Sequence, residues 1–172
     1  GYYYKPRLDW ELLAEHSEGV IATTGCLGGH VLQSLLRDDF DGAVKKAARL
    51  QDIFGRDNLF VEIQDHGIAE QIRTNPQLIE IARKIGAPLI ATNDSHYTHR
   101  EDHEAHDALL CVQTGSVLSD TKRFKFEGQE HYLKSADEMR SLFRDWPEAC
   151  DSTLWIAERA DVEITFGDAL LP

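Results

Sequence analysis

The strongest constraint on the fold is an alternation of short apolar runs with helical patterns along the chain. Three strand-like runs cover residues 19–25, 58–64 and 88–92, and helical segments separate them. A parallel return between strands requires a crossover of about a dozen residues or more, which these segments supply. The sequence therefore predicts an α/β fold built from βαβ units, in a chain long enough for one ordinary domain.

Helical spacing of apolar residues also predicts where the helices lie. Pro76 suits a first helical turn, so one helix is expected to open at Asn75-Pro76 and to close at Gly86. Residues 116–134 lack a helical pattern and are expected to form an extended, hairpin-like stretch. Other helices are expected near residues 10–16, twice between 31 and 53, from 101 to 112, from a capping box at 135–138, and at 148–160.

Charge and cysteine content exclude several classes of protein. The 30 acidic and 18 basic residues give a net charge of −12, which repels phosphate and argues against a free-standing DNA-binding protein. The three widely spaced cysteines argue against a disulfide framework or a zinc finger and favour a reducing cytoplasm. No apolar run approaches the roughly 20 residues of a membrane span. Because the chain starts without Met or a signal pattern, it is expected to be an excised segment.

Polar residues that could carry chemistry follow each predicted strand. In α/β folds the sites lie at the carboxyl ends of strands, so residues past the three runs are expected to share one face. Asn93, Asp94 and His96 follow the third run, and two side chains spaced as Asp94 and His96 can chelate one or two metal ions. Alternatively, Asp94 caps the next helical turn and His96 is a surface residue.

The residues past the other two strands are ambiguous when taken singly. Cys26 is a thiolate ligand, a nucleophile with His96 as its base, or an inert small apolar residue. Asp65 and His66 stand in a Gln-Asp-His-Gly segment, which is also what an ordinary turn looks like. Cys26, Asp65 and His66 all remain candidates for the same face as Asp94.

Two other polar clusters are weaker candidates. The histidines at positions 99, 103 and 106 have helical spacing, yet no glutamate completes a HExxH pattern, so no metal role is expected. The segment Lys122–Phe126 interleaves cations with aromatic rings as nucleic-acid surfaces do. An edge strand with its lysines outward is the favoured interpretation.

Taken together, the motifs of this chain resemble, in order and over its whole length, the alpha subunits of bacterial DNA polymerase III. The resemblance implies the later part of a polymerase-and-histidinol-phosphatase (PHP) domain at residues 1–150. Residues 151–172 would then connect toward the polymerase core. It implies the C-terminal part of a distorted seven-stranded βα (TIM-like) barrel with a helical exit segment. The motifs are Thr24–Cys26, Glu62–Gly67, Ala91–Tyr97, Ala108–Gly115, Arg123–Phe126 and Tyr132–Ser135.

The resemblance also implies a metal site. That family's domain holds up to three zinc- or manganese-type ions and can hydrolyse DNA from the 3′ end. Cys26, Asp94 and His96 match three of nine ligand positions, whereas Asp65 and His66 match a motif outside the ligand set. The other ligands lie upstream of this segment in the family, and the magnesium-dependent polymerase carboxylates lie downstream, so the segment alone is expected to be inactive.

The implied partners are DNA and other holoenzyme subunits such as the sliding clamp, with no membrane. Two other functions remain open. One is a stand-alone phosphatase of the same superfamily, against which the tail from Leu154 to Pro172 argues. The other is a non-catalytic scaffold that braces the polymerase or binds a proofreading subunit.

Overall fold

A computed structural model describes residues 2–164, 166 and 167, and its sheet has parallel strands as predicted. Two short strands, β1 (Tyr2–Tyr3) and β2 (Lys5–Pro6), form an antiparallel pair apart from the main sheet. The main elements are α1 (Trp10–Glu15), β3 (Ala22–Thr23), α2 (His30–Leu35), α3 (Phe40–Phe54), β4 (Leu59–Ile63), α4 (Ala69–Ile85), β5 (Leu89–Ala91), η1 (Arg100–Asp102), α5 (His103–Thr114), α6 (Ala136–Leu142) and α7 (Pro147–Arg159).

The main sheet has the strand order β3-β4-β5 with all strands parallel, which confirms the α/β prediction. Ala22 pairs with Leu59, and Val61 pairs with Leu89. All five residues of β4 are buried, as expected for a central strand covered by helices on its faces. The carboxyl ends of the three strands consequently meet at one edge.

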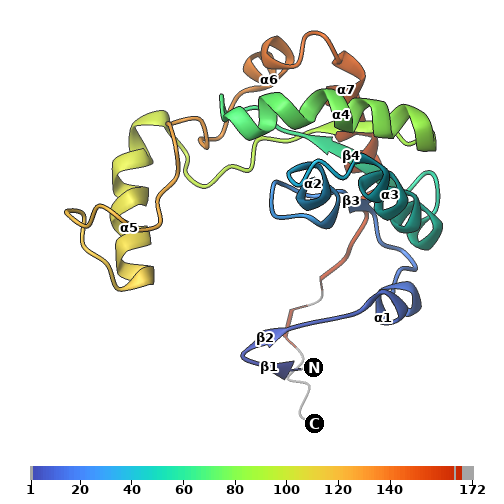
Figure 1. Cartoon of the computed structure of the whole chain (residues 1–172), viewed down its shortest axis with the longest axis horizontal. Helices are drawn as coiled ribbons and strands as arrows, with labels where there is room; N and C mark the ends of the chain where they lie inside the picture. The colour runs from blue at the N-terminus through green and yellow to red at the C-terminus, as the bar shows by residue number, and fades with distance from the viewer. Residues whose placement is uncertain (1, 165, 168–172) are drawn as a thin grey trace.

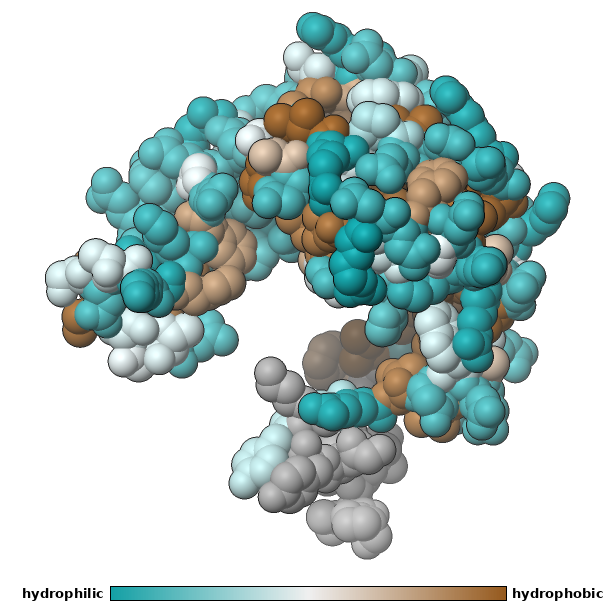
Figure 2. All heavy atoms as spheres, in the orientation of Figure 1, coloured by the Kyte–Doolittle hydropathy of each residue, from teal (hydrophilic) through white to brown (hydrophobic). Residues whose placement is uncertain are grey.

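Helices cover this small sheet and enclose one apolar core. α3 and α4 pack against β4, and α7 packs against β5. In Figure 1 these helices surround the strands, while α5 stands apart as a separate lobe. Figure 2 shows the surface hollowed between that lobe and the body that carries α2 and α3. The core includes Val31, Leu35, Ala47, Val61, Ile63, Leu78, Ile81, Phe143 and Ala149.

A buried carboxylate links the three strands. Glu62 of β4 accepts hydrogen bonds from the hydroxyls of Thr23 on β3, at 2.5 Å, and of Thr92 just past β5. The amide of Gln64 donates to the same carboxylate at 3.1 Å. A buried charge is costly unless it is hydrogen-bonded, so these donors make the glutamate a cross-strand tie.

The helix boundaries follow the predicted signals with one exception. The Ser135 capping box is present, and Gly86 ends α4 in the left-handed conformation. The helix expected to open at Pro76, however, already begins at Ala69, so that the proline lies inside it. Gln71 and Thr74 in the earlier turns are buried. We attribute the longer helix to this burial, which offsets the roughly 3 kcal/mol cost of an interior proline.

The prediction of a hairpin-like stretch at residues 116–134 is wrong, and Lys122–Phe126 is not an edge strand. The described backbone of that region pairs only through an isolated parallel bridge between Tyr97 and Tyr132. Side-chain contacts, and not a strand ladder, position this segment. Arg123 forms a two-pronged ion pair with Asp107 of α5, at 2.5 and 2.6 Å. Within the described part of the chain, no helix is both long and apolar enough to span a bilayer.

The loop after β3 turns back on itself too tightly for a side chain at Gly29. The backbone N–H of Gly29 donates to the Cys26 carbonyl at 2.8 Å. A Cβ atom at this glycine would lie 2.6 Å from the Thr24 carbonyl oxygen, closer than real Cβ atoms approach. At Gly28 it would meet only the Cys26 sulfur at 3.9 Å, an ordinary contact.

Gly29→Ala is therefore expected to lower the free energy of unfolding by about 1–3 kcal/mol, as overpacking against backbone does. Gly28→Ala is the matched control and should change stability by no more than about 0.5 kcal/mol. Urea unfolding of both variants makes the comparison. Equal stabilities would show that the loop relaxes without cost.

Candidate metal centre

Three side chains at the sheet edge converge to form a group that could hold a metal ion. They are Asp94, His96 and His131, and one potential ligand atom from each lies within 4.8 Å of the other two. Asp94 and His96 belong to the loop after β5, whereas His131 precedes α6 by a few residues. One carboxylate and two imidazoles form a ligand set typical of divalent transition metals.

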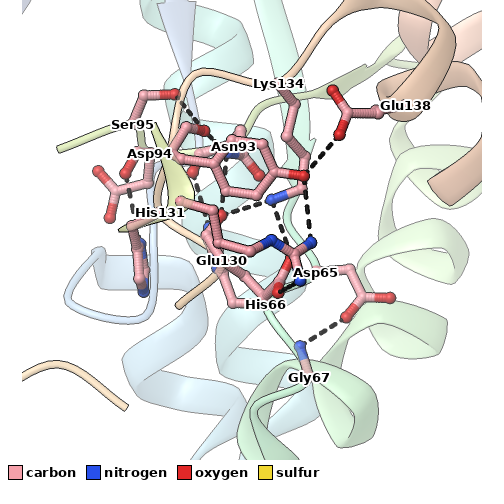
Figure 3. Close-up of polar contacts among 12 residues, drawn as sticks. Asp65, His66, Gly67, Asn93, Asp94, Ser95, Glu130, His131, Lys134 and Glu138 are labelled. Carbon is pink, nitrogen blue, oxygen red and sulfur yellow. Dashed lines mark hydrogen bonds and ion pairs between the residues drawn. The ribbon is translucent and has the colours of Figure 1, made fainter. Parts of the chain in front are cut away.

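Hydrogen bonds between two distant segments bring the third ligand to the first two. The Asn93 amide donates to the Tyr132 carbonyl at 2.6 Å and to the Glu130 carbonyl at 3.1 Å. The backbone N–H of His96 donates to the His131 carbonyl at 2.7 Å. Figure 3 shows Asn93 between the two segments, with Asp94 and His131 close to each other beside it.

The backbone at Asp94 is left-handed, with φ of 46°, and not extended as in a strand. Non-glycine residues adopt this conformation rarely, although aspartate tolerates it better than most, and such residues cluster at functional sites. Asp94 does not cap a helix either, because η1 begins later with His99 as its N-cap. The turn at Asp94 aims its carboxylate at the His96 ring, 3.8 Å from Nδ1.

The His96 ring is set up to present one nitrogen to a metal. Its Nδ1 atom lies 2.7 Å from the backbone carbonyl of Asp94, which can only accept a hydrogen bond. A proton on Nδ1 leaves the Nε2 lone pair free, the usual arrangement for a metal-binding imidazole. His96 is an exposed residue, with 34% of its side-chain surface open to solvent.

His131 is buried, and it is kept neutral by its surroundings. Burial lowers its pKa to about 4, and the neighbouring His66 acts on the pKa in the same direction. The two rings stack with centroids 3.9 Å apart and an interplanar angle of 18°. A neutral imidazole is the form that binds metals.

His66 is itself locked in place, which fixes the ring against which His131 stacks. Its Nε2 atom lies 2.7 Å from the Asn93 carbonyl, so it donates there. The Gln71 amide nitrogen then donates to Nδ1 at 2.8 Å. His66 therefore belongs to the face predicted from sequence, as a support behind His131.

Cys26 and Asp65, the other candidates from the sequence, lie outside this group of three residues. Cys26 is exposed and lines a pocket of about 530 Å³ together with Asp94 and His131. It is not among the three residues grouped within 4.8 Å, so its role as a ligand stays a prediction. Asp65 turns away and accepts a hydrogen bond from the Gly67 backbone at 2.9 Å (Figure 3).

Comparison with known proteins identifies the family. The PHP domain family matches residues 1–66. A DNA polymerase III subunit alpha from Saccharopolyspora erythraea is 49% identical over 162 residues, covering 94% of this chain and 14% of that protein. The subunit from Treponema pallidum is 45% identical over 172 residues, covering 100% and 15%. That from Deinococcus radiodurans is 45% identical over 170 residues, covering 97% and 13%.

The chain belongs to the DNA polymerase III alpha subunit family. The resemblance inferred from the motifs is thereby confirmed. The chain spans 13 to 15% of the length of these relatives. The PHP match ends at His66, so Asp94, His96 and His131 lie beyond the residues that it covers.

Sequence reasoning about an alpha subunit segment missed His131. This residue follows no predicted strand, and its separation of 37 positions from Asp94 gives no local spacing signal. It also lies in the stretch misread as hairpin-like. The Asn93 amide was the available clue, because a buried amide after a strand needs carbonyl partners elsewhere in the chain.

In a full-length alpha subunit that carries this segment, His131→Ala is expected to weaken binding of Zn²⁺ or Mn²⁺ by about tenfold or more. His16→Ala, an exposed histidine at the end of α1, is the matched control. Competition with a fluorescent chelator gives both affinities, and melting curves check that the variants stay folded. Wild-type affinity in a folded His131→Ala variant would remove this residue from the metal centre.

Proposed function

We propose that this segment forms part of a PHP metal centre that hydrolyses DNA from the 3′ end, a proofreading exonuclease within the intact alpha subunit. The observation that carries the proposal is the convergence of Asp94, His96 and His131 at the sheet edge. Family membership adds support, because the relatives are DNA polymerase III alpha subunits.

The donor set suits zinc or manganese-type ions better than magnesium, which prefers all-oxygen octahedra. Asp94, His96 and His131 would hold the ion, and Cys26 in the same pocket would add a softer donor. When bound, such an ion polarises a phosphate oxygen, lowers the pKa of water and offsets charge on the leaving oxygen. The protein's part is to fix the ligands: the Asn93 amide holds the loops together, and His66 supports the His131 ring.

The wider setting follows from the same proposal. Residues 1–150 would complete a seven-stranded βα barrel with further strands of the intact subunit. Residues 151–172, of which 165 and 168–172 lie outside the described residues, would lead toward a magnesium-dependent polymerase core. DNA and other holoenzyme subunits, such as the sliding clamp, would be the partners. The three free cysteines suit a reducing bacterial cytoplasm.

Asp94→Asn in a full-length alpha subunit is expected to reduce metal occupancy and 3′ exonuclease activity by about 10- to 100-fold. Asparagine keeps the shape and one oxygen ligand but removes the anion that offsets the charge of the metal. Nucleotide incorporation should change much less, because it uses other carboxylates. Asp65→Asn is the matched control and should proofread as the parent does, since its carboxylate bonds the Gly67 N–H and turns away from the centre.

Metal analysis, digestion of a 3′-labelled strand and primer extension measure the three quantities on the same preparation. If a stably folded Asp94→Asn variant proofreads as well as the parent, the hydrolytic proposal fails. A scaffold that braces the polymerase would then be the better account of the domain.

A further inference from the structure

We propose that Phe124 forms a stacking subsite for the 3′-terminal base of a DNA strand, in the pocket that also contains Asp94 and His131. The inference rests on the proposed exonuclease function and names how that site would hold its substrate. Two aromatic residues, Phe124 and Phe126, lie in the wall of the 530 Å³ pocket. They belong to the segment Lys122–Phe126, which contributes none of the three grouped ligands.

Phe126 is the inner ring and packs directly against the metal-binding histidines. Its centroid lies 4.5 Å from that of His96 and 4.7 Å from that of His131, both in edge-on contacts. A third edge-on contact, at 5.0 Å, joins it to His106 of α5. Phe126 is therefore engaged on several sides and forms the floor between the ligands and the rest of the pocket.

Phe124 is the outer ring, and it is open to a ligand. Its side chain is 59% exposed, and its one described ring contact is a perpendicular one to Phe126 at 5.7 Å. A perpendicular neighbour covers at most one face of the ring, so the other face is open to a nucleobase, which stacks there whatever its sequence. The base of a nucleotide is one sugar away from its phosphate. A phosphate held at the metal centre would thus leave its base within reach of this ring.

The backbone that carries the Phe124 ring is anchored on both sides, in spite of the exposure of the ring. The preceding residue, Arg123, forms the two-pronged ion pair with Asp107 of α5, and its side chain is only 9% exposed. Phe126 fixes the segment on the other side. An anchored aromatic ring loses little conformational freedom on binding, so more of the stacking energy appears as affinity.

The charges around the pocket favour a base over a run of phosphates. Lys125 lines the wall, but Glu70 and Glu127 line it too, and the whole chain carries a net charge of −12. Attraction of the phosphate backbone therefore cannot supply the affinity outside the metal centre. Stacking of an uncharged base depends little on the negative charge around the pocket. The partner that fits is the terminal nucleotide of a single strand, with its base on Phe124.

The test uses a full-length alpha subunit and an oligodeoxynucleotide with 2-aminopurine as its 3′-terminal base, which loses fluorescence on stacking. Phe124→Ala is expected to abolish the part of the quenching that comes from stacking on this ring. It should also raise KM for exonuclease digestion about tenfold, with kcat little changed. Phe124→Trp should restore both. Phe166→Ala is the matched control, since this phenylalanine is 89% exposed and does not line the pocket.

Two further arms separate the possible failures. A strand with an abasic 3′ terminus should give the same KM with the wild type and with the Phe124→Ala variant, because no base is there to stack. Equal quenching and KM in wild type and Phe124→Ala would overturn the subsite, as would Phe124-dependent quenching only of an internal 2-aminopurine. If the wild type shows no exonuclease activity, the proposed function fails, yet the quenching still decides whether Phe124 stacks a terminal base.

Discussion

The candidate site depends on one amide, that of Asn93, because it ties together two loops that are far apart in the chain. Its two donated hydrogen bonds, to the carbonyls of Tyr132 and Glu130, are reinforced by the His96 N–H bond to His131. Buried amides and carbonyls must find partners, so this pairing is favoured over solvent-exposed loops. It delivers His131 to Asp94 and His96, and no strand of the described sheet does so.

The rest of the structure gives this contact a rigid base. Glu62 ties the three strands through two threonine hydroxyls, and β5 then directs Asn93 and the following loop to the sheet edge. His66, in the loop after β4, accepts a hydrogen bond from the Gln71 amide and donates one to the Asn93 carbonyl, so its ring is fixed where His131 stacks. Together these hydrogen bonds favour one arrangement of the two loops and of the stacked rings.

The parts of the fold and of the site that could be predicted are those that depend on residues close together in the sequence. The three parallel strands, the capping box at Ser135 and the pairing of Asp94 with His96 depend on short spacings, and the sequence contains them directly. The start of α4 was misjudged because burial of Gln71 and Thr74 outweighed the local signal of Pro76. His131 and the course of residues 116–134 depend on contacts with α5 and with the loop after β5. Tertiary contacts of that kind leave no periodic trace in a sequence.

The central claim is that Asp94, His96 and His131 bind one divalent ion, and anomalous X-ray scattering tests it most directly. Crystals of a full-length alpha subunit carrying this segment, loaded with Zn²⁺ or Mn²⁺, would be measured at the metal absorption edge. The account predicts an anomalous peak about 2.0–2.2 Å from a ligand atom of each of the three residues. A peak ligated by other residues, with the His131 ring turned away from it, would contradict the account.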